Sequence, residues 1–404
     1  MIRSFYKSVV GLLVVAASLL PRDADARLIP AFARKYGVSC SLCHTVVPKL
    51  SAYGDVFAGN GFRMAPGGPP RDTLDTGDRM LQLMKSFPLA ARLDAYTQAY
   101  INGANESDLQ LPYNVKLLSG GEISSSLSYY FYFFLFERGE VGGIEDAYVY
   151  WNDIGGIPLD GAVGQFQVSD PMFKRELRLS YQDYVVYRAR VGYQPADLTY
   201  DRGVMAIGDI GRLTLAGQIV NGNGRGEAEP NRQLDNDPHK NLFGHVSASI
   251  VPQFRLGAMG YFGKQNGAAD ETAPVLTNTL WMAGADATLA VGAVELNLQY
   301  VHREDDNPTF APSEPKAITN GGFAELIVHP PGKRWYAFGL YNFVDCNQPL
   351  LSFRLGGPSD VDRYQAIAAG AGYTVRRNFR LLFEGNWDIE LEATRWTLGL
   401  STAF

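Results

Sequence analysis

Cys40, Cys43 and His44 are the residues of this chain whose types and spacing most directly imply chemistry. Two thiols three positions apart can each form a thioether with a haem vinyl group, and the adjacent imidazole can then bind the iron. A redox or zinc pair is the alternative, but a zinc site needs a second ligand pair nearby, and the next histidine is His239. The motif therefore predicts one covalent haem c with His44 as the proximal iron ligand. Cys346 stands apart and needs no partner.

A second axial ligand is expected from a methionine, since no other histidine lies close in sequence. Met64, Met80 and Met84 are the candidates, and a thioether ligand would raise the haem potential. We take Met64 as the predicted distal ligand. A five-coordinate iron, or a ligand from the remainder of the chain, is the alternative.

The motif lies in a short segment between a targeting sequence and a linker. Arg3 and Lys7 precede an apolar stretch at 9–20 and a small-x-small pattern at 24–26, which predicts a signal peptide over 1–26 rather than a buried helix. Export agrees with haem attachment, which takes place outside the cytoplasm. The c-type cytochrome segment is expected over 27–64 and a linker over 65–88.

The haem segment holds only 38 residues, too few for a domain that stabilises itself without a cofactor or partner surface. We therefore expect the haem to form part of its core. An apolar stripe following Pro48 predicts one short helix that ends near Asn60, and its members are Leu50, Tyr53 and Phe57.

The rest of the chain reads as all-β. Among 404 residues there are 43 Gly, 22 Tyr, 22 Phe and 5 Trp with only 19% charged residues and a net charge of -6, which excludes disorder, collagen and a basic nucleic-acid binder. Beyond the N-terminus no apolar run approaches the ~18 residues of a membrane-spanning helix. From position 379 onward apolar and polar residues alternate, so Leu381 and Leu398 are expected to face lipid and Leu382 a wet lumen. A soluble sandwich is the alternative.

Long polar loops and short turns alternate along 89–404, as in barrels of the bacterial outer membrane, where the short turns face the periplasm. We predict a transmembrane β-barrel with an even number of strands, sixteen, provided that 169–198 is one long loop and 183–190 is not a strand. The predicted strands are 90–101, 109–118, 123–136, 143–152, 159–168, 199–208, 212–220, 242–251, 254–263, 279–289, 293–302, 321–329, 334–344, 364–375, 379–390 and 395–404.

Charged residues gather in three of the loops. Loop 169–198 could fold inward, where its guanidinium groups would hold haem propionates or small anions, or it could be a solvated loop. The other two loops suggest an acidic outer rim that binds divalent iron weakly, or a solvated surface. The residues concerned are Lys174, Arg175, Arg178, Arg188 and Arg190 in the first, Glu227, Glu229, Asp235, Asp237 and His239 in the second, and Glu304, Asp305 and Asp306 in the third.

Several motifs together resemble one known family. They are IPAFARKYG at 29–37, the CxxCH motif, PxLxxYGxxF at 48–57, GQFQVSDP at 164–171 and KRELRL at 174–179. The chain is similar over essentially its whole length to the fused monohaem cytochrome–porins of the bacterial outer membrane, whose best-known members oxidise iron. The resemblance implies a haem segment that plugs the barrel and passes electrons inward from extracellular Fe(II) to a periplasmic cytochrome.

One-electron transfer needs no general acid, base or nucleophile, and no catalytic triad, P-loop or dinucleotide fingerprint is found in the sequence. The expected function is therefore electron transfer across the outer membrane, from Fe(II). A conduit that exports electrons to an extracellular acceptor, and a diffusion porin with a structural haem plug, are the alternatives.

Overall fold

The computed structural model describes residues 31–64, 73–74, 76–78, 80–81, 83–84, 87–102, 106–269, 272–313, 315–353 and 358–404. The signal peptide expected over 1–26 lies outside the described residues, as do parts of the linker. Within the described ranges, no helix has the length and apolar character that crossing a membrane requires.

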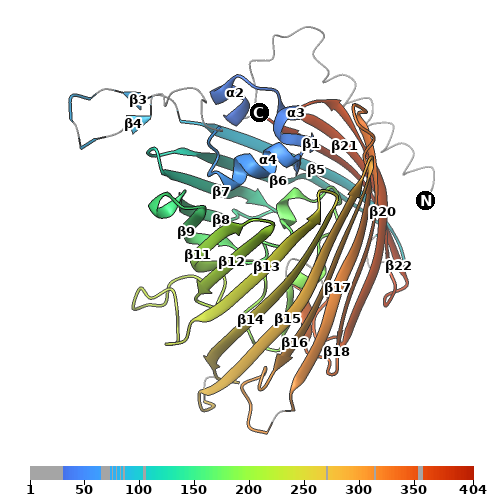
Figure 1. Ribbon diagram of the computed structural model, residues 1–404. Coiled ribbons are helices and arrows are strands. Elements are labelled where there is room, and N and C mark those ends of the chain that lie inside the picture. The colour runs from blue at the N-terminus through green and yellow to red at the C-terminus, as the bar shows by residue number, and fades with distance from the viewer. Residues whose placement is uncertain are drawn as a thin grey trace.

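Sixteen antiparallel strands form one closed barrel (Figure 1). Each pairs with the next barrel strand along the chain, and β22 pairs with β5 to complete the ring. Closure pairs the edges that an open sheet would leave free. The strands are β5 (Leu89–Ile101), β6 (Ser107–Glu122), β7 (Leu127–Glu137), β8 (Ile144–Trp151), β9 (Leu159–Gln167), β11 (Tyr200–Ile210), β12 (Leu213–Val220), β13 (Asn241–Val251), β14 (Phe254–Gly267), β15 (Leu276–Val291), β16 (Val294–Asp305), β17 (Ala317–Val328), β18 (Trp335–Cys346), β20 (Arg363–Arg376), β21 (Phe379–Asp388) and β22 (Ala393–Ala403).

The prediction of a sixteen-stranded barrel is confirmed, and every predicted strand has its counterpart. The differences lie at the strand ends. Beside the long loops, β14 and β16 run past their predicted ends and β17 begins before its predicted start, and at a short turn β6 ends later and β7 begins later than predicted. The segment 183–190 is not a barrel strand. Instead, β10 (Ala189–Val191) pairs with β19 (Leu351–Phe353) in a separate two-stranded sheet.

Side chains of β21 alternate between the outer surface and the interior of the barrel. Phe383 and Trp387 are 46% and 47% exposed, whereas Glu384 is 0% exposed. Successive residues of a strand point to opposite faces, so one face is apolar and outward while the other faces the barrel interior. An outward apolar face is the surface that a membrane barrel presents to lipid.

The inward face is not wet throughout. Leu382, which was expected to face a water-filled lumen, is only 4% exposed and belongs to an apolar cluster with Tyr336 and Phe338. The expectation of a wet position is therefore wrong. An arginine at 382 would place a charge among apolar side chains without a partner, at considerable cost.

Substituting Leu398→Arg is expected to destabilise the barrel by ~2–4 kcal/mol, because this position lies in the middle of β22 and pairs with the outward Phe383. Thr402→Arg is the matched control on the same face near the end of the strand, where the cost should fall to ~0–1 kcal/mol. Reversible unfolding by denaturant in lipid vesicles measures both. Equal costs at the two positions would contradict the assigned lipid face.

Residues 169–198 leave the barrel wall after β9 and fold into the interior. The hydroxyl of Tyr184 donates a 2.8 Å hydrogen bond to Glu325 of β17, and that of Tyr187 donates one of 2.8 Å to Gln299 of β16. Around these bonds, side chains of the loop and of the wall form one buried apolar cluster, which includes Val185, Val186, Val191 and Leu198 from the loop and Met259, Leu280, Met282 and Phe323 from the wall. The barrel thus has an apolar core inside its lumen.

The arginines of this loop are neutralised by carboxylates of the same loop. Arg175, Arg178 and Arg188 converge on the buried Asp183, with nitrogen–oxygen distances of 3.7 Å from Arg178 and 3.4 Å from Arg188. Burial alone would raise the pKa of Asp183, but the three guanidinium groups hold it far below its usual range. Arg190 pairs with Asp197 at 2.9 Å. The inward-folding prediction is confirmed, but these guanidinium groups are engaged within the loop and not free for anions.

Candidate functional site

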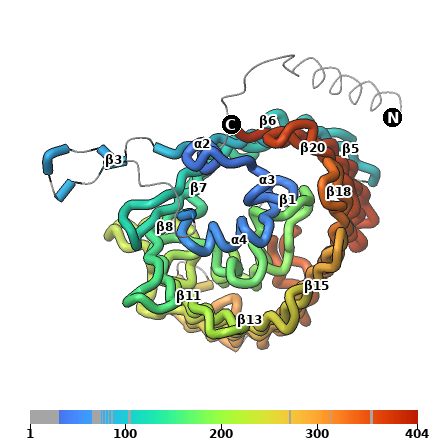
Figure 2. Tube along the Cα trace, turned by 45° about the horizontal axis from the view of Figure 1, so that its top comes forward, coloured from blue at the N-terminus to red at the C-terminus, as the bar shows by residue number. Residues whose placement is uncertain are grey.

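The segment that carries the CxxCH motif forms five short elements at one end of the barrel (Figure 1). Figure 2 looks into the barrel and shows α3, α4 and β1 within it. The helix predicted to follow Pro48 begins only at Ala52, because Ser51 caps it by accepting a 3.1 Å hydrogen bond from the backbone N–H of Gly54. The elements are α2 (Ala31–Tyr36), α3 (Cys40–Cys43), β1 (His44–Val46), β2 (Lys49–Leu50) and α4 (Ala52–Gly59).

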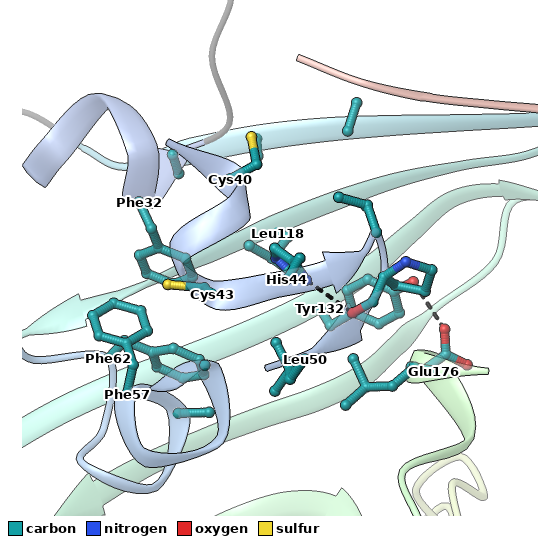
Figure 3. A pocket seen from close by; sticks show the side chains of 18 of the residues that line it. Phe32, Cys40, Cys43, His44, Leu50, Phe57, Phe62, Leu118, Tyr132 and Glu176 are labelled. Carbon is teal, nitrogen blue, oxygen red and sulfur yellow. Dashed lines mark hydrogen bonds between the residues drawn. The ribbon is translucent and has the colours of Figure 1, made fainter. Parts of the chain in front are cut away.

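Cys40 and Cys43 occupy the two ends of α3, a single helical turn, and His44 follows directly. One turn of helix brings residues three apart to the same side. All three side chains line one cavity (Figure 3), and both thiols are free and half-buried. The structure therefore brings together the three residues that the sequence singled out.

The imidazole of His44 is oriented by the backbone. Its Nδ1 lies 2.9 Å from the carbonyl oxygen of Pro48, so Nδ1–H donates and Nε2 keeps its lone pair (Figure 3). Burial lowers the pKa of His44, which favours the neutral imidazole. A neutral ring with one nitrogen bonded to a carbonyl and the other free is the form that binds a metal.

The cavity has walls from both parts of the chain. Phe32 and Phe62 of the N-terminal segment stack with ring centroids 4.9 Å apart, and Phe62 stacks on Tyr130 of β7 at 4.8 Å. Gly54 allows α4 to approach α3, since a Cβ there would lie 2.0 Å from the carbonyl oxygen of Cys43. A mostly apolar, aromatic-lined space beside two thiols and an oriented imidazole fits a haem, by the chemistry of its donor set.

Met64 lines the same cavity, and the hydroxyl of Tyr53 lies 3.3 Å from its sulfur. Met80 is 93% exposed, close to β4 (Leu83–Met84), which pairs with β3 (Thr73–Leu74) in a hairpin that Figure 1 shows projecting away from the barrel. Of the three candidate methionines, Met64 is thus the one that lines the same cavity as His44.

Met64→Ala is expected to change the visible spectrum of the oxidised protein and to lower its midpoint potential, because a thioether ligand stabilises the reduced iron. Met80→Ala is the matched control and should leave both quantities unchanged, given the exposure of that side chain. Spectroelectrochemistry of the two purified variants measures the difference. An unaltered spectrum in Met64→Ala would exclude this sulfur as the ligand.

Barrel residues that the sequence did not single out complete the floor of the cavity. Lys116 of β6 pairs with Glu176 of the inward loop at 2.8 Å, and the hydroxyl of Tyr132 donates a 3.0 Å hydrogen bond to the same carboxylate (Figure 3). Burial would raise the pKa of Glu176, but Lys116 and Arg178 lower it to about 2. The alternation of apolar and polar residues in β6 and β7 could have indicated that 116 and 132 point inward. It does not indicate that their partner is Glu176.

The expected acidic rim is neutralised in part. Lys316 lies 3.4 Å from Glu304 and 3.0 Å from Asp306, and the buried Asp305 pairs with Arg303 at 2.6 Å. In the other acidic loop, Asp235 pairs with Lys240. Across the described part of the chain, no three His, Cys, Asp or Glu side chains are grouped to hold a metal ion. The described loops therefore offer no assembled site for divalent iron.

The closed ring of sixteen strands, the apolar outer face and the loop folded into the lumen define a porin-type β-barrel. The anion-selective porin of Comamonas acidovorans has a similar structure, with a TM-score of 0.54 at 13% identity over 79% of this chain and 99% of that one. OmpT of Vibrio cholerae gives 0.53 at 10% identity over 79% and 99%, and Salmonella typhi OmpF in complex with daunomycin gives 0.52 at 11% over 79% and 97%. No protein-family model and no curated protein matches the sequence.

Proposed function

We propose that this barrel carries one covalent haem c and moves single electrons across the outer membrane, as the resemblance to cytochrome–porins implies. Extracellular Fe(II) would lose one electron to become Fe(III), and a periplasmic carrier would gain that electron. The observation that carries the proposal is the convergence of Cys40, Cys43 and His44 on one cavity that the N-terminal segment and the barrel wall together enclose. A haem held there supplies a one-electron redox centre.

The position of the cavity supports the step from the haem to a periplasmic carrier. Arg377 and Asn378, which also line it, form the short turn between β20 and β21. Short turns face the periplasm in barrels of this type, so the cavity lies near the periplasmic end. Phe32, Phe57 and Phe62 line it with aromatic rings that pack against one another.

The packing of the lumen also favours electron transfer over solute diffusion. A diffusion porin needs a continuous polar passage, whereas loop 169–198 here forms an apolar cluster with the wall. The contrary observation is the likeness to porins, the anion-selective porin of Comamonas acidovorans among them, which favours a diffusion function as the second candidate. Solute flux into liposomes that contain the purified protein separates the two, because electron transfer requires none.

Anaerobic addition of Fe(II) to the purified, oxidised protein tests the proposal. We expect the haem absorption bands to shift to those of the reduced form without any added partner. The Cys40→Ala, Cys43→Ala double variant is the control and should give no such change. Failure of Fe(II) to reduce a haem that a strong chemical reductant does reduce would contradict iron oxidation and favour the export of electrons.

A further inference from the structure

Four cations lie on two neighbouring short turns of the barrel. Lys333 and Arg334 are in the turn between β17 and β18, and Arg376 and Arg377 are at the turn between β20 and β21. The two turns are adjacent, since the backbone N–H of Thr374 donates a 2.7 Å hydrogen bond to the carbonyl of Arg334. All four side chains belong to exposed residues, and within the described residues none of them forms an ion pair. We call these four residues the basic rim.

Two other cations near this end of the barrel lie in ion pairs. Lys49 of β2 pairs with Glu295 at 2.6 Å, and Arg63 lies 3.7 Å from Asp153. Unpaired like charges held close together repel one another, so a cluster of four raises the energy of the free protein. An acidic surface brought against them would relieve that repulsion.

The basic rim adjoins the candidate haem cavity. Arg377 is itself a lining residue, and Asn378 beside it accepts a 3.0 Å hydrogen bond from the backbone N–H of Ala403, another lining residue. A partner that covers the rim would therefore lie close to the cavity. Electron transfer requires such proximity.

We infer that the basic rim is the docking surface for an acidic electron-carrier protein of the periplasm. The inference rests on the proposed function and adds the charge of the partner and the face that it uses. Lipid phosphates are the other anions at this level, but lipid reaches only the outer face, whereas Arg377 lines the cavity. Complementary charge would speed association and orient the carrier toward the cavity.

Binding to the oxidised protein in nanodiscs, without Fe(II), tests this inference. The probes are flavodoxin as an acidic carrier and mitochondrial cytochrome c as a basic one. We expect flavodoxin to bind, with an affinity that falls about tenfold or more as salt is raised and the Debye length shrinks. Reversing two charges with Arg334→Glu and Arg376→Glu should lower the affinity for flavodoxin by at least about tenfold, and the variant should bind cytochrome c.

The matched control reverses two exposed cations toward the long-loop end, with Arg232→Glu and Lys264→Glu, and should leave flavodoxin binding unchanged. Unaltered haem spectra and heat-resistant migration on gels verify that each variant is folded. Equal flavodoxin affinity for the wild type and both variants would overturn the inference. The inference would also be overturned if the charge-reversed variant kept its affinity for flavodoxin and lost stability only in anionic lipid, because the cations would then bind lipid headgroups.

The outcome is separable from the proposed iron oxidation. Docking is measured as binding, so it can succeed even if Fe(II) fails to reduce the haem, and only the assignment of the donor would then be lost. Conversely, Fe(II) could reduce the haem while the affinity for flavodoxin stays independent of the rim charges. That result would support the redox function and exclude the basic rim as the docking surface.

Discussion

The double variant Cys40→Ala, Cys43→Ala is expected to retain no covalently bound haem. Its haem stain on denaturing gels should therefore be lost completely. The thiols are the atoms that would form the thioethers, and both lie free on the cavity wall. Cys346→Ala is the matched control. That cysteine is buried at the end of β18, in the wall cluster rather than the cavity, so its removal should leave the stain at full strength.

The barrel itself should survive the double substitution. Its strands close on one another through β22 and β5, and its lumen core is formed by loop 169–198, both without the two cysteines. The haem segment should become protease-sensitive, because its elements are short and a haem would supply much of their core. Mass spectrometry and gel mobility measure both effects. A variant that still stains would show that the haem assignment of this motif is wrong.

Asp183→Asn is expected to destabilise the inward loop by about 3–5 kcal/mol, the cost typical of leaving buried charges without their partner. The carboxylate lies among Arg175, Arg178 and Arg188, and the amide that replaces it cannot balance them. Release of the loop would open a passage, so conductance in planar bilayers should rise well above that of the wild type. Limited proteolysis within 169–198 provides the second measurement.

Asp345→Asn is the control for that experiment, since Asp345 pairs with Arg363 at 2.8 Å but both side chains are about half exposed. Screening by water makes such a pair weak, and conductance should not change. The depressed pKa of Asp183 also gives a sign for pH. Its stabilisation is fully present above the unfolded pKa of about 3.9 and is lost gradually as the pH falls from there toward the much lower folded pKa, so most of it remains at pH 3. Low conductance of the wild type at both pH 3 and pH 7, together with high conductance of Asp183→Asn, would agree with this assignment. An unchanged conductance in Asp183→Asn would contradict it.

The strands were predictable because lipid imposes a simple rule on them. Outward positions such as Phe383 and Trp387 must be apolar, and because successive side chains of a strand point to opposite faces, apolar residues recur at every second position. The rule ends where the strands leave the membrane. β14 and β16 continue past their predicted ends because backbone hydrogen bonds to neighbouring strands hold these extensions. Such pairing does not require alternating apolar residues, so the sequence did not indicate it.

The site was predictable only in its N-terminal half. Cys40, Cys43 and His44 are neighbours in sequence, so their spacing is visible, whereas the contact of Lys116 with Glu176 joins residues that only barrel closure brings together. The same limit explains Leu382. Inward residues normally face water in a wide barrel, and no local pattern indicates that a distant loop will cover this one.

The apolar core inside the lumen has a consequence for how this protein responds to temperature. Exposure of apolar surface to water on unfolding gives a positive heat-capacity change, which curves the dependence of stability on temperature. A barrel with a water-filled lumen exposes little new apolar surface of this kind, but here side chains such as Tyr187, Leu280 and Phe323 would all be newly hydrated. The interior therefore gives this membrane protein the thermal behaviour of a water-soluble globule, in which the stabilisation contributed by the core weakens on cooling.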